Sequence, residues 1–226
     1  MFRNLIFDWS GTLVDDLGPV IEATNAVMDH YALPRFDRVR FRHQFRLPYR
    51  EFYHDLLPNI PLEELEARFR SAFDTALTPV TVLPHAREKL AWCAASGLRV
   101  FVLTSMDTTA FERQLDDLDL RRFFEATYSG VADKRERIHS ILETHRLDPA
   151  ETAFVGDMIH DVETARHGGI ASIAVLTGYT LPEILAASQP DLTVANLDAL
   201  QKLLDKPSDP ECRCKPLTPS RSAACA

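Results

Sequence analysis

The sequence lacks several features that would assign it to a special class of protein. None of its apolar runs approaches the ~20 residues that a membrane-spanning helix needs, and the N-terminus shows no signal-peptide pattern. It has no excess of basic residues, because 33 acidic and 25 basic side chains give a net charge of −8. Nucleic-acid-binding proteins usually carry a basic face, so we expect neither a nucleic acid nor a membrane as a partner.

Cysteine is also scarce. Cys93 lies in a helical pattern, and the other three cysteines, Cys212, Cys214 and Cys225, lie near the C-terminus. Since no CxxC pair or even-numbered framework spans the chain, a reducing cytoplasm is the expected location. Cys212 and Cys214 alone are far from a complete zinc site, so we expect no zinc there.

What the sequence does contain is an alternation of short apolar runs and helical patterns. It has 226 residues, of which 46% are hydrophobic and 26% charged, the composition of an ordinary globular protein. Short apolar runs predict strands at residues 5–7, 98–103, 124–128, 152–155, 170–176 and 192–194. Helical patterns separate them at residues 84–96, 107–117, 134–145 and 161–167. This order predicts an α/β fold, a Rossmann-like parallel sheet with helices on both faces.

One region interrupts this alternation. Between residues 31 and 81 there is no convincing buried strand, and helical patterns cover residues 19–30 and 62–77. We therefore predict a core domain from residues 1–15 and 81–206, with residues 16–80 inserted as a helical cap domain. The last residues, 207–226, are rich in Pro, Ser and Cys without periodicity, and we predict a disordered tail there.

Polar side chains end three of the apolar runs. Asp8, Thr104 and Asp157 follow their strands directly, and Asp161 comes four residues after Asp157. Because the carboxyl ends of parallel strands meet at one crevice, we expect these side chains to converge. The carboxylates form an oxygen-rich cluster that suits Mg²⁺, and Lys134, before a helix, could balance its charge.

The motifs around these residues resemble those of a known family. They are DWSGT at residues 8–12, FVLTS at 101–105, the loop lysine Lys134 in VADKRERI, and GDMIHD at 156–161. Together the four motifs are similar to those of the haloacid dehalogenase superfamily of phosphohydrolases, in its phosphoglycolate phosphatase-like group with a helical cap. The resemblance covers residues 2 to about 204.

The resemblance implies a catalytic centre on Mg²⁺. Asp8 would attack phosphorus and form an aspartyl-phosphate, so that hydrolysis is split into two displacements. Mg²⁺ would be held by Asp8, the backbone carbonyl of Ser10 and Asp157, with Asp161 ordering its surroundings. Such a site works by positioning and charge stabilisation.

The resemblance also implies which groups hold the phosphoryl oxygens. Thr104 and Ser105 would bind them together with the backbone amides after Asp8, including those of Gly11 and Thr12. Lys134 would neutralise charge shared by nucleophile and phosphate.

The sequence departs from the family at one catalytic position. Phosphatases of the family carry, two residues after the nucleophile, an Asp that protonates the leaving oxygen and then activates water; here it is Ser10. A hydroxyl cannot serve as an acid–base group near neutral pH, and losing such catalysis costs about 10²–10⁴-fold in rate. We therefore expect a slow phosphatase, a leaving group that needs no proton, or another acid, with His160 and His85 as candidates.

The insert is rich in arginine. Six lie between residues 35 and 50: Arg35, Arg38, Arg40, Arg42, Arg46 and Arg50. Most of them fit a solvated basic helix face. In the stretch FRLPYRE, which is similar to the specificity segment of such caps, we expect Arg46 and Arg50 to bind an anionic substrate tail.

The favoured hypothesis is a Mg²⁺-dependent phosphatase that hydrolyses a small phosphorylated metabolite, as a monomer or homodimer. The alternatives are a weakened relative that binds a phosphorylated ligand or partner, and a phosphotransferase. Two other relatives fit less well. Phosphonatases need a cap lysine, and no lysine occurs between Asp16 and His85; dehalogenases lack the acids found here at Asp157 and Asp161.

Overall fold

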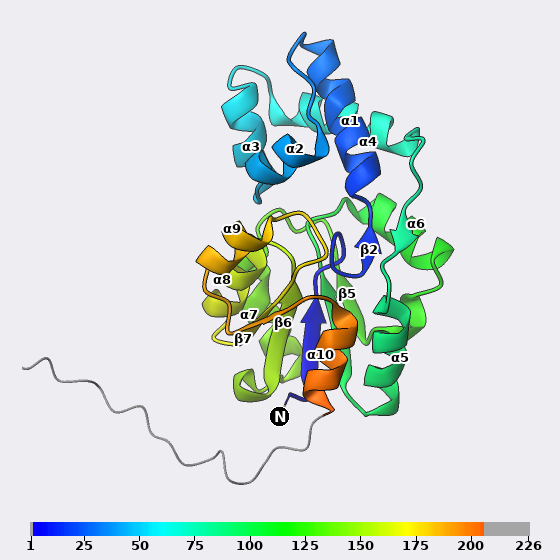
Figure 1. Cartoon of the computed structure of the whole chain (residues 1–226), viewed down its shortest axis with the longest axis vertical. Helices are drawn as coiled ribbons and strands as arrows, with labels where there is room; N and C mark the ends of the chain where they lie inside the picture. The colour runs from blue at the N-terminus through cyan, green and yellow to red at the C-terminus, as the bar shows by residue number, and fades with distance from the viewer. Residues whose placement is uncertain (1, 206–226) are drawn as a thin grey trace, which may run out of the picture.

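The computed structural model describes residues 2–205, and the predicted disordered tail with its cysteines lies outside them. Its centre is a six-stranded parallel sheet with the strand order β5-β4-β1-β6-β7-β8 (Figure 1). The strands are β1 (Asn4–Phe7), β4 (Arg99–Leu103), β5 (Ala126–Tyr128), β6 (Thr152–Gly156), β7 (Ala171–Val175) and β8 (Leu192–Val194). All six were predicted, with ends that differ by no more than two residues. The α/β fold is thus confirmed.

Helices connect the strands. They are α5 (Ala86–Ala95), α6 (Thr108–Asp117), α7 (Arg135–His145), α8 (Ile159–His167), α9 (Pro182–Ala187) and α10 (Leu197–Leu204), with short 3₁₀ turns η1 (Arg121–Phe123) and η2 (Pro149–Glu151). The sequence patterns did not predict α9 and α10. In the described part of the chain no helix is both long and apolar enough to cross a membrane.

Alternate side chains of the strands build the two faces of the sheet. In β1, Leu5 and Phe7 are fully buried in one cluster, which includes side chains of α5, α6 and α10. Ile6 is buried in a second cluster, with side chains of α7 and α8. Successive strand residues point to opposite faces, so a run of apolar residues fits a strand covered on both sides.

Four further helices, here called the cap, lie beyond the end of the sheet at which β1 finishes (Figure 1). They are α1 (Leu17–His30), α2 (Arg38–Gln44), α3 (Tyr49–Leu56) and α4 (Leu62–Asp74). The chain enters and leaves the cap through a short antiparallel pair, β2 (Val14–Asp15) with β3 (Thr81–Val82). Helices α2 and α3 and this strand pair were not predicted, and α4 ends three residues before the predicted end.

The cap has an apolar core of its own. Phe36, Phe41 and Phe52 are buried there with side chains from all four helices. Two residues of core loops, Met158 and Tyr179, belong to the same cluster. The cap therefore packs on the loops that follow β6 and β7.

Candidate active site

The register of the sheet brings the strand ends together. Phe7 of β1 lies opposite Val102 of β4 on one side and Val155 of β6 on the other. The chain therefore leaves β1, β4 and β6 at one edge, where Asp8, Thr104 and Asp157 follow. This convergence is the one that strand order and parallel direction predict.

Three buried carboxylates gather at this edge. Oxygen atoms of Asp8, Asp157 and Asp161 all lie within 4.8 Å of one another. The ammonium group of Lys134, itself fully buried, lies 2.7 Å from Oδ1 of Asp8 and 2.7 Å from Oδ1 of Asp161. Four charged groups thus share one small buried volume, with more acids than bases.

Glycines next to the acids leave room for their carboxylates, and hydrogen bonds hold Asp157 in place. A Cβ atom at Gly178 would lie 2.0 Å from Oδ2 of Asp157, and one at Gly156 would lie 2.3 Å from the carboxylate of Asp161. Only glycine allows the backbone to come so close. Asp157 accepts hydrogen bonds from the Thr12 hydroxyl at 2.8 Å and the Tyr179 amide at 2.7 Å.

Burial changes the proton affinity of this cluster. Burial raises the pKa of Asp8 to about 7, although the charge of Lys134 opposes the change. Burial and the charges of Asp8 and Asp161 raise the pKa of Asp157 well above its usual range. For Lys134, burial alone would lower the pKa, but the charges of Asp161 and Asp8 outweigh it and raise the pKa. Because a buried acid cluster with one lysine is short of positive charge, its hard oxygen donors fit a divalent cation such as Mg²⁺.

A fourth buried acid, Asp16, lies beside Ser10. The Ser10 hydroxyl donates a hydrogen bond to Oδ2 of Asp16 at 2.5 Å, and the Tyr179 hydroxyl donates one to Oδ1 at 2.8 Å. Burial raises the pKa of Asp16 to about 6, although these two hydrogen bonds oppose the change. A carboxyl with such a pKa can both give and take a proton near neutral pH.

A cavity of about 640 Å³ lies between these residues and the cap. Its polar end, here called the floor, is formed by Asp8, Ser10, Asp16, Thr104 and Ser105. Its apolar end, here called the roof, is formed by the cap residues Val20, Phe45, Leu47, Tyr53, Phe69 and Phe73. In the described structure the buried hydroxyl oxygen of Ser105 has no hydrogen-bond partner, so it is free for a ligand.

Comparison with known proteins agrees with the fold and the motifs. The family model described as haloacid dehalogenase-like hydrolase matches residues 5–175. The chain belongs to the haloacid dehalogenase-like hydrolase family. The family resemblance inferred from the sequence is thus confirmed.

Several relatives are named phosphoglycolate phosphatase. This hydrolase is 29% identical over 216 residues to a phosphoglycolate phosphatase of Chromobacterium violaceum, covering 89% of this chain and 96% of that protein. It is 28% identical over 159 residues to the phosphoglycolate phosphatase of Salmonella typhi, covering 66% of this chain and 63% of that protein. The match to the Salmonella protein thus spans less than two thirds of that relative's length.

Solved structures show the same fold. A haloacid dehalogenase-like family hydrolase from Streptococcus pneumoniae superposes with a TM-score of 0.80 at 23% identity, covering 90% of this chain and 98% of that one. A hydrolase from Pseudomonas syringae gives a TM-score of 0.77 at 18% identity, covering 90% and 98%.

Two residues of the first motif lie outside the cavity of this hydrolase. The Gly11 amide donates to the Val14 carbonyl, the Thr12 amide donates to the Trp9 carbonyl, and the Thr12 hydroxyl holds Asp157. Neither residue is among those that line the cavity. They shape the turn and position the acid, whereas the sequence predicted contact with the phosphoryl group.

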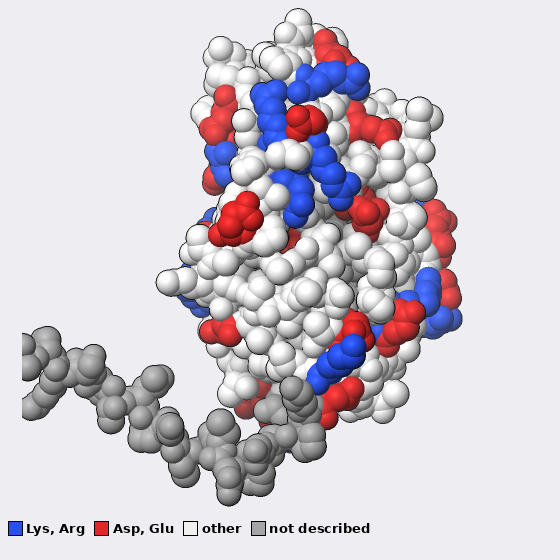
Figure 2. Space-filling model, viewed as in Figure 1, with Lys and Arg blue, Asp and Glu red and all other residues white. Residues whose placement is uncertain are grey.

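The structure does not bring Arg46 and Arg50 to Asp8. Arg46 is paired with Asp55 and Glu51 and lines a second cavity, and Arg50 lines a third. Basic side chains do gather over the cap on one face, with acidic side chains among them (Figure 2). Arg42 instead donates to the backbone carbonyls of Tyr179 and Thr180, which ties the cap to a core loop.

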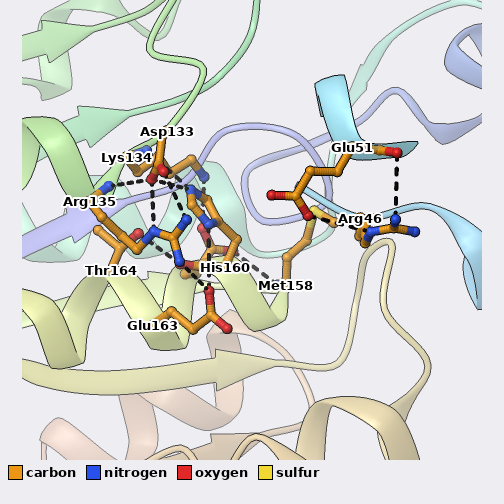
Figure 3. A network of polar contacts seen from close by, with 10 residues as sticks. Arg46, Glu51, Asp133, Lys134, Arg135, Met158, His160, Glu163 and Thr164 are labelled. Carbon is orange, nitrogen blue, oxygen red and sulfur yellow. Dashed lines mark hydrogen bonds and ion pairs between the residues drawn. The ribbon is translucent and has the colours of Figure 1, made fainter. Parts of the chain in front are cut away.

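Neither histidine that was considered as a replacement acid lines the floor of the cavity. His85 is exposed at the start of α5. His160 is buried and accepts a hydrogen bond from the Lys134 amide at 3.1 Å, beside Arg135 and Glu163 (Figure 3). Burial lowers the pKa of His160 to about 4, so it is neutral and serves the loop that carries Lys134.

Sequence reasoning missed Asp16, Tyr179 and the aromatic roof. Gly11 turns the chain so that Ser10 forms a bridge with Val14, and this places residue 16 beside residue 10. Gly11 indicated a turn, but nothing in the sequence indicated how many residues the turn contains. Tyr179 lies 163 residues from Asp16 and could be paired with it only in three dimensions.

Proposed function

We propose that this protein is a Mg²⁺-dependent phosphomonoesterase that forms an aspartyl-phosphate on Asp8. The observation that carries this proposal is the buried cluster of Asp8, Asp157 and Asp161 with Lys134 at the floor of a cavity. The names of the relatives, phosphoglycolate phosphatases, support the same reaction class.

Magnesium would be held by side-chain oxygens of Asp8 and Asp157 and by the backbone carbonyl of Ser10, with Asp161 fixing the surroundings. The excess of buried carboxylates over Lys134 is the feature that fits such an ion. When bound, the ion supplies positive charge that keeps the acids ionised and offsets charge on the phosphoryl oxygens.

The protein's own residues then carry the reaction. A carboxylate oxygen of Asp8 forms a bond to phosphorus as the bond to the leaving oxygen breaks. Lys134 favours the ionised form of Asp8, and the hydroxyls of Thr104 and Ser105 bind phosphoryl oxygens across the cavity. In the second step water attacks phosphorus, inorganic phosphate leaves, and the Asp8 carboxylate is restored.

Each step also moves a proton, and we assign that task to Asp16. In the first step the Ser10 hydroxyl gives its proton to the leaving oxygen and takes one from Asp16. In the second step the attacking water gives its proton to Ser10, which passes its own back to Asp16. The hydrogen bond of 2.5 Å between Ser10 and Asp16, and the shared cavity with Asp8, support this route.

A second candidate function rests on Ser10, which stands where the family has its acid. A protein without acid–base catalysis could bind a phosphorylated ligand without turning it over, or pass the phosphoryl group to another acceptor. The position of Asp16 favours turnover over binding alone.

The test is Mg²⁺-dependent release of nitrophenol from p-nitrophenyl phosphate by the purified chain. We expect turnover with Mg²⁺, its loss with a chelator, and its loss in Asp8→Asn. A stable Asp8 adduct with fluoroberyllate but no turnover on a broad panel of phosphate esters would favour the binding protein instead.

A further inference from the structure

The cavity above Asp8 is larger than a small phosphorylated acid requires. Its volume of about 640 Å³ lies within the range of ~300–1,000 Å³ that is common for sites of drug-sized ligands. A phosphoryl group on a two-carbon tail, seated on Asp8, would leave most of this space empty. The part it would leave empty is the roof.

The roof presents apolar rings to this space. Phe69 and Phe73, one turn apart on α4, stack with ring centroids 5.8 Å apart. Both are only half-buried, unlike the fully buried phenylalanines Phe41 and Phe52 in the core of the cap. Two half-buried rings on the wall of a cavity offer a ligand apolar surface that the protein itself does not cover.

The cations on the cavity wall are already paired. Among the described residues that line it, the only cations are Arg70 and Arg113. Arg70 lies 3.7 Å from Glu66, and Arg113 lies 2.7 Å from Asp74, and both of these acids line the same cavity. A second anionic group on the substrate would therefore find no uncompensated positive charge beyond the phosphoryl site.

From these observations we infer that the substrate, if the proposed function holds, is a phosphate monoester of a bulky, apolar, uncharged alcohol that carries an aromatic ring. The phosphoryl group lies on the floor, and the ring lies against Phe69, Phe73 and their neighbours in the roof. Arg46 and Arg50, which could have recognised a carboxylate tail, line other cavities.

Two esters with alcohols of similar acidity isolate the effect of the ring. They are 2-phenylethyl phosphate and ethyl phosphate, and phosphoglycolate serves as a small ester with a second negative charge. Because burying an apolar group discriminates by about tenfold or more, we expect kcat/KM for the phenylethyl ester to exceed that of the other two by at least about tenfold. The difference should lie mainly in KM.

The roof is tested by the double variant Phe69→Ala/Phe73→Ala. It should lower kcat/KM for the phenylethyl ester at least about tenfold more than kcat/KM for ethyl phosphate, and so remove most of the preference. Phe123→Ala removes a half-buried ring that does not line the cavity, and it should keep the preference. Equal or better turnover of phosphoglycolate, or an equal loss on both alkyl esters, would overturn the inference.

Binding without turnover separates this inference from the proposed function. By calorimetry with Mg²⁺ present, 2-phenylethylphosphonate should bind at least about tenfold more tightly than ethylphosphonate. That result with no hydrolysis of any ester would contradict the phosphatase and uphold the ring-binding roof. Equal affinity for the two phosphonates would contradict the roof alone.

Discussion

The floor and the roof of the cavity hold their side chains in different ways. On the floor, the acids are fixed by short directional contacts, Asp8 with Lys134 and Asp16 with two hydroxyls. In the roof, the cap presents aromatic and aliphatic side chains that make apolar contacts. The floor is thus suited to catalysis, and the roof is suited to selecting the substrate.

The largest difference between the two regions should come from Asp8. Asp8→Asn removes the nucleophile and should lower kcat by roughly 10⁴-fold or more. The roof variant Phe69→Ala/Phe73→Ala should leave kcat for ethyl phosphate nearly unchanged. Steady-state kinetics of both variants on that ester makes the comparison. If the kcat of Asp8→Asn stayed within tenfold of the kcat of the unmodified protein, the proposed difference between the catalytic floor and the roof would be wrong.

The second-largest effect should come from Asp16→Asn. We expect a loss of about 10²–10⁴-fold in kcat, because this change removes the group that gives and takes the proton. The matched control is Asp15→Asn, a neighbouring acid that does not line the cavity, and its kcat should change by less than about threefold. Equal effects of the two changes would show that Asp16 acts only on the fold. The reciprocal change Ser10→Asp in the Asp16→Asn background should restore part of the rate.

Lys134→Met should reduce stability by about 3–5 kcal/mol, because it leaves buried acids without their cation. The control is Lys202→Met, which breaks an exposed pair with Asp198 and should cost less than about 1 kcal/mol. Urea unfolding without Mg²⁺ measures both. A small effect of Lys134→Met at pH 8, above the pKa of about 7 for Asp8, would mean that Lys134 does not offset charge on the acid cluster.

Magnesium and pH should act on the floor together. The folded protein holds protons on Asp8 and Asp16, whose pKa values are about 7 and 6, at pH values where the unfolded chain has lost them. Without metal, stability from these groups should therefore fall as pH rises from about 4 to 7. Mg²⁺ at 100 times its Kd should add about 2.7 kcal/mol and reduce that fall. Melting curves that become steadily more stable toward pH 8 without metal would contradict this.

Arg46→Ala should have the smallest effect. Its guanidinium is paired with Asp55 and Glu51 outside the cavity that holds Asp8, so kcat/KM should change by less than about twofold on all three esters. A selective loss on phosphoglycolate would restore the sequence-based prediction that this arginine binds an anionic tail.

Much of the floor could be predicted because it depends on local patterns and on strand order. Asp8, Thr104 and Asp157 each follow a short apolar run, and parallel strands necessarily end at one edge. The motif containing Asp161 and the loop of Lys134 follow from the family resemblance. The roof could not be predicted in the same way. The direction in which Phe69 or Arg46 points depends on how α2, α3 and α4 pack. Helix α2 has no regular apolar pattern, and α3, whose apolar residues do recur at helical spacing, is only 8 residues long.

Asp16 is the clearest example of a site residue that could not be predicted from the sequence. Its role depends on a tight turn at Gly11 and on Tyr179, which arrives from the loop after β7. The sequence showed that an acid was missing at position 10, and its two histidine candidates lie away from the floor. The proposed replacement, Asp16, lies six residues further along the chain than Ser10.

The most direct test of the account is to trap the phosphorylated side chain. The protein is mixed with Mg²⁺ and 2-phenylethyl phosphate, quenched in acid, reduced with borohydride and analysed by peptide mass spectrometry. We predict conversion of Asp8, and of no other aspartate, to homoserine. Turnover without any modified aspartate, or modification at a position other than 8, would contradict the account.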